Sequence, residues 1–251
     1  MSRFNFVLFL LLISFTSMAQ REKQPSYFGI QIRPIFPSSF GGSKTLELTG
    51  ENYKFKLTQT VGYSFGGTIR KGITKLIAFE SGLNFTHRSF RNTMSLTDTS
   101  VMADDKWSFD SYDIPINALV YIQLSQEIYM NTSMGLALRI SPNDIKKITE
   151  TGGAHSFTNI GRYTAKIGFN LNANVGFEYR TREKGFFYFG GSIGVPLKPI
   201  IELYSLHSVI KQTHVTQLKG MVNGNYLAID LKYFFPLISK KGDQPLKGPI
   251  E

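Results

Sequence analysis

Four histidines are the side chains best suited to acid–base or metal chemistry, namely His87, His155, His207 and His214. His87 and Ser89 share one face of an extended strand, and such a pair makes a nucleophile only where a third group orients the base. His207 and His214 can gather a metal with Glu202, yet the spacings of five and seven residues match no strong ligand pattern. We therefore predict no catalytic residue and no metal site, with a hydrolase as the alternative.

The chain has no cysteine. This excludes a disulfide scaffold, a thiol nucleophile and the acylated cysteine of a lipoprotein. No glycine-rich phosphate loop is present either, and pairs such as Gly66-Gly67 and Gly190-Gly191 instead suit strand coiling and bulges. We predict no cofactor.

Charged residues recur at positions that alternate with apolar ones, and this register predicts that they line one interior. The basic members are Arg33, Arg70, Arg88, Arg139, Lys166, Arg180 and Lys232, and the acidic members are Glu80, Asp113, Glu178 and Asp230. An unpaired charge is costly in a water-poor lumen, so we predict a mixed-sign structural network. Seven bases against four acids leave positive charge for water, loop carboxylates or a bound anion to balance. A proton or ion path is the alternative.

Strands must position these groups, and residues 163–180 show this best. Every odd position there is apolar or aromatic, and every even position is polar, charged or glycine. At about 3.3 Å per residue such a strand spans roughly 59 Å, enough to cross a bilayer and project beyond it. A soluble sandwich also alternates, but the glycine and asparagine residues at the centre of the even face suit a crowded lumen.

The same alternation predicts eight strands at 27–36, 57–70, 76–88, 107–124, 127–140, 163–180, 186–197 and 224–236. Their connections alternate between long and short, which is typical of long outer loops and short periplasmic turns. Within the first long connection, 45–48 and 53–57 continue upward as strands around a turn at 49–52. We predict an all-β protein, an eight-stranded antiparallel up-and-down transmembrane β-barrel. A barrel of this size is filled by side chains, which disfavours an open pore.

Aromatic residues gather on the outward register at the short-turn ends of the strands. They are Phe28, Phe79, Phe177, Tyr179, Phe187, Phe189, Tyr233 and Phe235. Such a girdle marks one membrane interface. Core packing in a soluble sheet is the competing interpretation.

The N-terminus has the pattern of a secretory signal over residues 1–19. A basic start at Arg3 precedes an apolar run from Phe6 to Phe15, and small residues surround a cleavage site after Ala19. The apolar run is too short to span a membrane as an anchoring helix. We expect the barrel to occupy 20–236 and a short periplasmic tail to occupy 237–251.

The formal net charge of +10 does not indicate nucleic-acid binding, because the basic residues are spread singly. Anionic headgroups of outer-membrane lipid, lipopolysaccharide phosphates or a protein partner are the expected counterparts. The alternative interpretation is that these basic residues only keep the long connections soluble. The long connections that carry them contain Lys146, Lys147, Arg162, Lys198, Lys211 and Lys219.

Two consecutive segments carry a family likeness. YDIPINALVY at 112–121 places Asp113, Ile114 and Pro115 on one strand, and IYMNTSMGL at 128–136 follows with a central glycine at Gly135. The pair at 61–63 and 79–83 is similar. In these features the chain resembles the PorT-type outer-membrane β-barrel family of Bacteroidetes over roughly residues 27–236. The resemblance implies a multi-pass barrel in the outer membrane of a Gram-negative bacterium, with protein export as one role.

The sequence as a whole favours a non-enzymatic barrel with a filled lumen. Its expected role is structural, in attachment or in an envelope protein complex such as one for protein export. A hydrolase at the outer rim acting on lipid or peptide, and a narrow channel, remain the alternatives.

Overall fold

The computed structural model describes residues 26–40, 42–74, 76–97, 101–142, 144–151, 155–181, 184–209 and 215–236. The predicted signal peptide at 1–19 and the predicted tail at 237–251 lie outside these described residues. Over the ranges described, the chain forms no helix that is long and apolar enough to cross a membrane.

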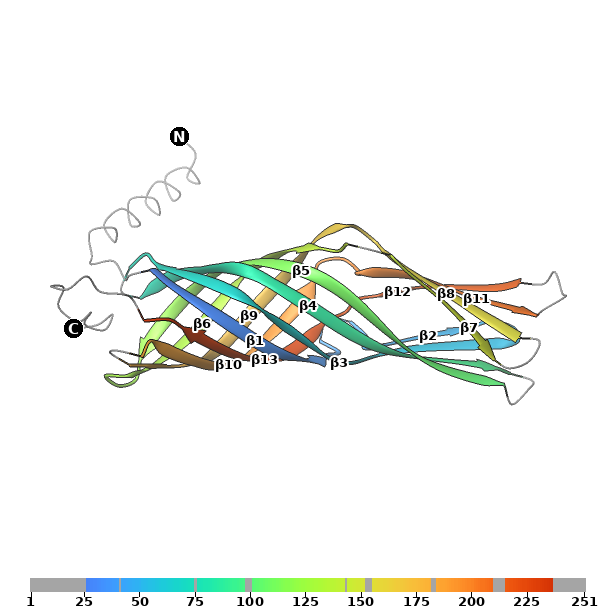
Figure 1. The fold of residues 1–251 in the computed structure, drawn as a ribbon, viewed down its shortest axis with the longest axis horizontal. Helices are drawn as coiled ribbons and strands as arrows, with labels where there is room; N and C mark the ends of the chain where they lie inside the picture. The colour runs from blue at the N-terminus through green and yellow to red at the C-terminus, as the bar shows by residue number, and fades with distance from the viewer. Residues whose placement is uncertain are drawn as a thin grey trace, which may run out of the picture.

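Eight antiparallel strands of the described chain close into a ring (Figure 1). They are β1 (Ser26–Pro37), β3 (Tyr53–Gly72), β4 (Ile77–Leu96), β5 (Met102–Gln123), β6 (Ile128–Ile140), β9 (Ile167–Arg180), β10 (Phe186–Pro196) and β13 (Tyr226–Phe234). Around the ring the order is β1-β13-β10-β9-β6-β5-β4-β3, and β1 pairs with β3 to complete it. The predicted eight-stranded up-and-down barrel is confirmed.

Five further strands lie at the long-loop end and form what we call the extension. They are β2 (Thr45–Thr49), β7 (Ile145–Thr151), β8 (His155–Tyr163), β11 (Ile201–Val209) and β12 (Val215–Val222). The hairpin strand β2 pairs with β3, and the other four make a second sheet in the order β12-β11-β8-β7. Figure 1 shows this sheet beside the outer halves of β3, β4 and β5, which run on from the barrel wall. The extension is therefore a two-layered β-structure built onto one end of the barrel.

The prediction of one continuous strand over 163–180 is wrong. The chain forms β8 up to Tyr163 and β9 from Ile167, and the two strands belong to different sheets. Backbone hydrogen bonds hold the break: Thr164 N donates to Ile200 O at 3.1 Å, and Ser141 N donates to Lys166 O at 2.8 Å. Alternation continues across the break because both sheets have one buried and one outward face, so the pattern does not reveal it.

Three connections predicted as long loops, 89–106, 141–162 and 198–223, consist largely of strands. In the first long connection the prediction is confirmed, because β2 and the start of β3 form a hairpin there. In β4, for example, the predicted strand ends at Arg88, just past the apolar outward residue Phe85, whereas the backbone pairing with β3 continues to Leu96.

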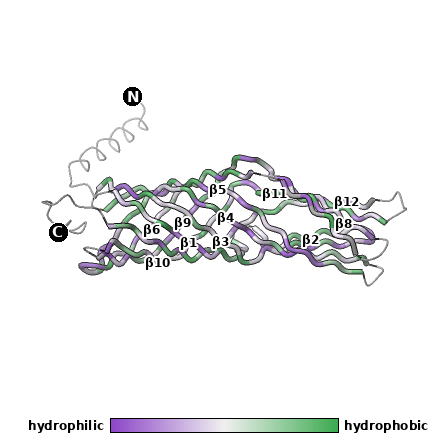
Figure 2. Tube along the Cα trace, viewed as in Figure 1, coloured by the Kyte–Doolittle hydropathy of each residue, from purple (hydrophilic) through white to green (hydrophobic). Residues whose placement is uncertain are grey.

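Side-chain polarity reverses along the wall, as β4 shows. Its even positions point inward along the whole strand. In the barrel these inward residues are polar, such as Glu80 and Asn84, but in the extension they are apolar, such as Phe90 and Met94. The barrel therefore has a hydrophilic interior and an apolar exterior, and the extension has the opposite arrangement, that of a water-soluble sandwich. Figure 2 shows the alternation along the strands of both parts.

In β3 the same reversal is produced by a change of register. The pairing with β4 shifts between Thr60 and Tyr63, which marks a β-bulge. On the extension side of the bulge, odd residues such as Phe55 point inward. On the barrel side, odd residues such as Phe65 point outward. One odd-numbered series, apolar except at Gln59 and Gly67 between Tyr53 and Ile69, thus fills the core of the extension and then covers the outside of the barrel, because a bulge re-aims every side chain that follows it.

Candidate functional site

The lower lumen, at the short-turn end, is filled by an ion-pair network. Arg70 donates to Glu80 Oε2 from Nε at 3.0 Å and from Nη2 at 2.6 Å, and its Nη1 donates to Glu178. Lys232 Nζ donates to the other Glu80 oxygen at 2.5 Å. Arg180 donates to Glu178 Oε2 from Nε at 3.0 Å and from Nη2 at 2.8 Å. Both carboxylates thus bridge two cations.

Aromatic rings hold the same cations from the side. The Cζ atom of Arg70 lies 4.2 Å from the Phe234 ring centroid, and that of Arg180 lies 4.4 Å from the Tyr129 centroid. Lys232 Nζ lies 5.0 Å from the Tyr188 centroid. Cation–π contacts in a desolvated site stabilise charge that carboxylates alone do not balance. Three cations against two carboxylates are therefore accommodated here.

The upper lumen, towards the extension, is paired less completely. Arg33 Nε lies 3.7 Å from Asp230 Oδ1, and Thr86 donates to Asp113 Oδ2 at 2.7 Å. Arg88 and Arg139 each donate one hydrogen bond, to Ser111 at 3.0 Å and to Asn170 at 3.1 Å. Buried charges at this level thus have mainly neutral partners.

Ten of the eleven residues predicted for the lumen network point into the lumen, and Lys166 does not. Lys166 lies in the break between β8 and β9 and is exposed. Its place on the even register was inferred from the continuous strand that the structure does not contain. The predicted set in the lumen is thereby reduced to six cations and four carboxylates.

An apolar core in the extension covers the upper end of the lumen. It consists of Tyr53, Phe55, Leu57, Phe90, Met94, Leu96, Ala103, Trp107, Phe109, Phe157, Ile200, Ile201, Leu203 and Val222. A short polar chain crosses it, in which Tyr53 and Ser205 share a hydrogen bond and Ser205 donates to Asn159. Burial raises the pKa of Tyr53 to about 12, although the hydrogen bond with Ser205 opposes this shift. Between this core and the lower network, the cavity beside Asp113 and Asp230 measures only about 20 Å³, room for about one water.

All eight residues predicted for the girdle lie at the short-turn end of the outward face. Seven of them are exposed, and Tyr233 is half-buried. Phe28 stacks on Phe235 with centroids 5.7 Å apart, and Phe187 lies 4.9 Å from Tyr233. Tyr233 also contacts Phe235 at 5.2 Å, so these four rings form one linked cluster at the short-turn end.

A second aromatic cluster at the opposite end was not predicted from the sequence. Tyr63, Phe65, Phe85 and Tyr112 form it across β3, β4 and β5, with centroid separations from 5.3 to 6.4 Å. The sequence signal that marks it is the change from apolar to polar residues on the outward register, which occurs just beyond Phe85 and Tyr112. Two aromatic clusters therefore bound one apolar band.

His87 lies next to this second cluster, on the side towards the extension. Its Nδ1 is 2.6 Å from Asp110 Oδ1 on β5, and its ring stacks on Tyr63 at 4.8 Å. Asp110 supplies the third group that a serine–histidine pair requires, and Ser89 shares the outward face. Across the described residues, however, no hydroxyl is hydrogen-bonded to the other ring nitrogen of His87. Asp110 therefore orients His87 as a base would be oriented, but no nucleophilic hydroxyl among the described residues is bonded to it.

Within the described residues, His155 and His207 lie together and apart from Glu202. His155 Nδ1 lies 3.1 Å from His207 Nε2, while Glu202 is paired with Lys219 at 2.5 Å instead. His214 and Lys211 lie outside the described residues, as does the side chain of Lys147. In the part of the chain that the structure describes, no three histidine or carboxylate side chains cluster as metal ligands.

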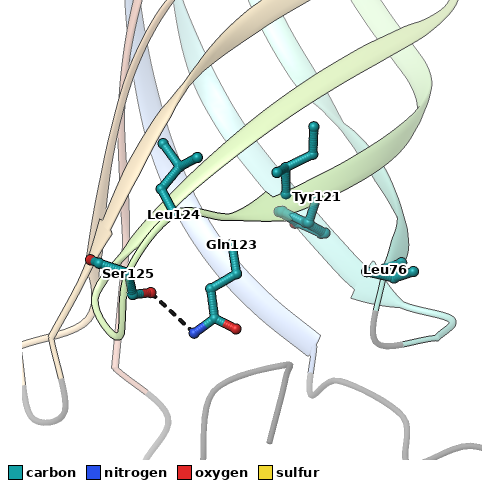
Figure 3. Close-up of a pocket in the computed structure, with 6 residues that line it drawn as sticks. Leu76, Tyr121, Gln123, Leu124 and Ser125 are labelled. Carbon is teal, nitrogen blue, oxygen red and sulfur yellow. Dashed lines mark hydrogen bonds between the residues drawn. The ribbon is translucent and has the colours of Figure 1, made fainter.

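An open hollow lies at the short-turn end and measures about 500 Å³. It is lined by Leu76, Tyr121, Ile122, Gln123, Leu124 and Ser125. Figure 3 shows Gln123 hydrogen-bonded to Ser125, at 3.0 Å through the backbone oxygen of Ser125. This lining has no carboxylate, amine or imidazole, so it has no acid–base pair for catalysis.

Comparison with solved structures finds a similar barrel. The chain is similar to the outer membrane protein OprG from Pseudomonas aeruginosa, with a TM-score of 0.50 and 11% identity over 87% of this chain and 99% of that one. This likeness shows the fold. No family model and no curated protein sequence matches the chain.

Proposed function

We propose that this chain is a non-enzymatic outer-membrane β-barrel whose lumen is closed and whose working surface is the extension. The apolar band supports the membrane location. Along β9 its outward residues run from Ile167 to Tyr179, which at about 3.3 Å per residue and a tilt of about 45° is about 28 Å of height. That height matches the hydrocarbon thickness that barrel proteins cross, and an aromatic cluster lies at each edge of it.

The proposal of a closed barrel depends on how both ends of the lumen are blocked. Ion pairs fill the lower lumen, and the apolar core of the extension lies over the upper lumen. An ion that entered would have to displace buried pairs and then pass through packed aromatic side chains. Both steps are costly.

Planar-bilayer recording of the purified protein tests this proposal. We expect no reproducible conductance steps, because the lumen contains no continuous water path. Steps that recur in independent reconstitutions, and that change size when Glu80 is replaced by Gln, would show that the narrow-channel alternative is correct.

We further propose that the extension contacts lipopolysaccharide phosphates and an envelope protein complex. Lys166 and Lys198 are exposed where the barrel meets the extension, at the level of headgroups above the apolar band. Basic side chains there gain favourable Coulomb energy from anionic headgroups. The resemblance to the PorT-type family supports protein export as the activity of such a complex.

Site-specific photocrosslinking in the native envelope tests the protein partner. A photoreactive residue in place of exposed Gln217 or half-buried Thr93 of the extension should yield a reproducible protein adduct. The same residue in place of Leu83, on the apolar band, should yield lipid adducts only. Identical adduct patterns at both levels would contradict a partner that recognises the extension.

A second candidate, hydrolysis of lipid esters at the outer rim, is favoured by the His87–Asp110 pair. Lipid ester bonds lie at the depth of this pair, just above an aromatic interface. Turnover of a fluorogenic phospholipid by the purified protein separates the two functions. We expect none, whereas turnover that His87→Ala and Ser89→Ala both abolish would establish the enzyme.

A further inference from the structure

The upper lumen contains more buried positive charge than its carboxylates neutralise. Arg88 and Arg139 are each only 2% exposed. The carboxylates at this level are Asp113 and Asp230, and Asp230 lies beside Arg33 at 3.7 Å. Three arginines against two carboxylates leave one positive charge in excess. A positive charge left uncompensated in the interior strongly destabilises the fold.

The unpartnered polar atoms around the two arginines are mostly donors. Arg88 Nε and Nη2, Arg139 Nε and Asn170 Nδ2 are buried and have no hydrogen-bond partner among the described residues. Asp113 Oδ1 is an unpartnered acceptor beside them, and the two Asp230 oxygens, which face Arg33, also accept no hydrogen bond among the described residues. A buried donor without a partner loses its hydration and gains nothing in return. A cluster of such donors around excess positive charge indicates a bound anion.

The two guanidinium groups lie near each other. Arg88 donates to Ser111 on β5, and Arg139 is paired in register with Asp113, two residues further along the same inward face of β5.

The surroundings limit the size of the anion. The Tyr226 ring covers Arg88, with Cζ 5.3 Å from the centroid, and Ile200 of the apolar core contacts Gly224 from above. The cavity of about 20 Å³ beside Asp113 and Tyr226 adjoins this level, but Arg88, Arg139 and Asn170 do not line it. The cover of Tyr226 and Ile200 leaves no opening for an organic ligand.

We propose that Arg88 and Arg139 bind one small inorganic anion of the size of chloride at the upper end of the lumen. Nε–H and Nη2–H of Arg88 and Nε–H of Arg139 donate to it, and the Asn170 amide adds a fourth donor. A single negative charge neutralises the excess at this level. The anion then fixes the two arginines beneath the apolar core of the extension. This site does not depend on which partner the extension binds.

Thermal unfolding of the purified protein in detergent tests the site. Chloride replaces gluconate at constant ionic strength, because gluconate carries the same charge but is too large for the site. We expect the midpoint to rise with chloride and to saturate, and Arg139→Gln to remove this dependence. The matched control is Arg91→Gln, an arginine on the exposed face of the same strand as Arg88, which should keep the full chloride effect.

Bromide-soaked crystals of the unaltered protein provide a measurement that needs no variant. We expect an anomalous peak between Arg88 and Arg139. Equal midpoints in chloride and gluconate would overturn the proposal. So would anomalous peaks confined to exposed lysines, or a chloride effect that Arg139→Gln leaves intact.

Discussion

Single residues in this barrel matter most where they connect several partners. Glu178 is fully buried and accepts hydrogen bonds from Arg70, from Asn131 at 2.5 Å and from Arg180. The pair of Lys56 and Glu47 on the extension has a comparable distance, 2.7 Å, but both side chains are more than half exposed. Comparing substitutions at the two sites therefore shows how much more a buried ion pair contributes to stability than a solvated one.

Glu178→Gln should destabilise the barrel by about 3–5 kcal/mol, because two buried arginines lose the carboxylate that neutralises them. Equilibrium unfolding by denaturant in detergent measures this change. The control Glu47→Gln should cost at most about 1 kcal/mol. Equal effects of the two substitutions would contradict a water-poor lumen.

The stability of the extension should depend on pH through His207. Burial, and next the neighbouring His155, lower the pKa of His207 from its ordinary value of 6.5. The folded extension therefore favours the neutral ring. Stability is retained above pH 6.5 and falls as the pH drops below that value, where the unfolded chain binds the proton more readily. Emission of Trp107 in the same core reports the transition.

His207→Asn should flatten this pH dependence, while His87→Asn on the outer face should leave it in place. A pH profile that His207→Asn does not change would show that another group controls it.

At the scale of elements, close backbone approach between strands decides which glycines are essential. A Cβ at Gly135 on β6 would lie 2.0 Å from Ile116 O and 2.6 Å from the Asn117 Cα on β5. A Cβ at Gly191 on β10 would meet nothing nearer than Ala228 O at 3.8 Å. Gly185, at the β9–β10 turn, has a φ of 74° and is needed for its conformation.

Gly135→Ala should therefore destabilise the barrel by about 1–3 kcal/mol, since backbone cannot move aside as a side-chain end can. Gly191→Ala is the control and should be nearly neutral. Refolding yield into lipid vesicles and the denaturation midpoint both measure the difference. A neutral Gly135→Ala would show that β5 and β6 are spaced more widely than the structure has them.

At the scale of the whole molecule, the barrel and the extension have surfaces of opposite polarity. Trp107 is the single tryptophan and is 3% exposed within the extension core, whereas Phe177 is 50% exposed on the apolar band. If the band lies in lipid, then only a fluorophore on the band meets acyl chains.

Lipid with brominated acyl chains should leave Trp107 emission nearly unchanged. In a Trp107→Phe background, Phe177→Trp should be strongly quenched by the same lipid. Quenching of Trp107, or none at position 177, would mean that the apolar band does not face hydrocarbon.

The sequence alone predicted much of this fold. Period-two alternation identified the eight barrel strands, and inward parity predicted ten lumen charges, among them Arg70, Glu80 and Glu178. It missed the second sheet, because its strands fall almost entirely within 141–162 and 198–223, which were predicted as long loops. It also misplaced Lys166. The odd–even assignment of this residue to the inward face assumed that one strand continues through residues 164–166.

Local alternation is a property of the backbone pleat, so the sequence by itself determined that the chain is a set of strands with one polar and one apolar face. It does not specify what each face contacts. The bulge between Thr60 and Tyr63, the break at 164–166 and the pairing of β8 with β11 are long-range features. Tertiary structure alone decided that one apolar series turns from the core of the extension to the outside of the barrel, because a register shift re-aims side chains without altering their order.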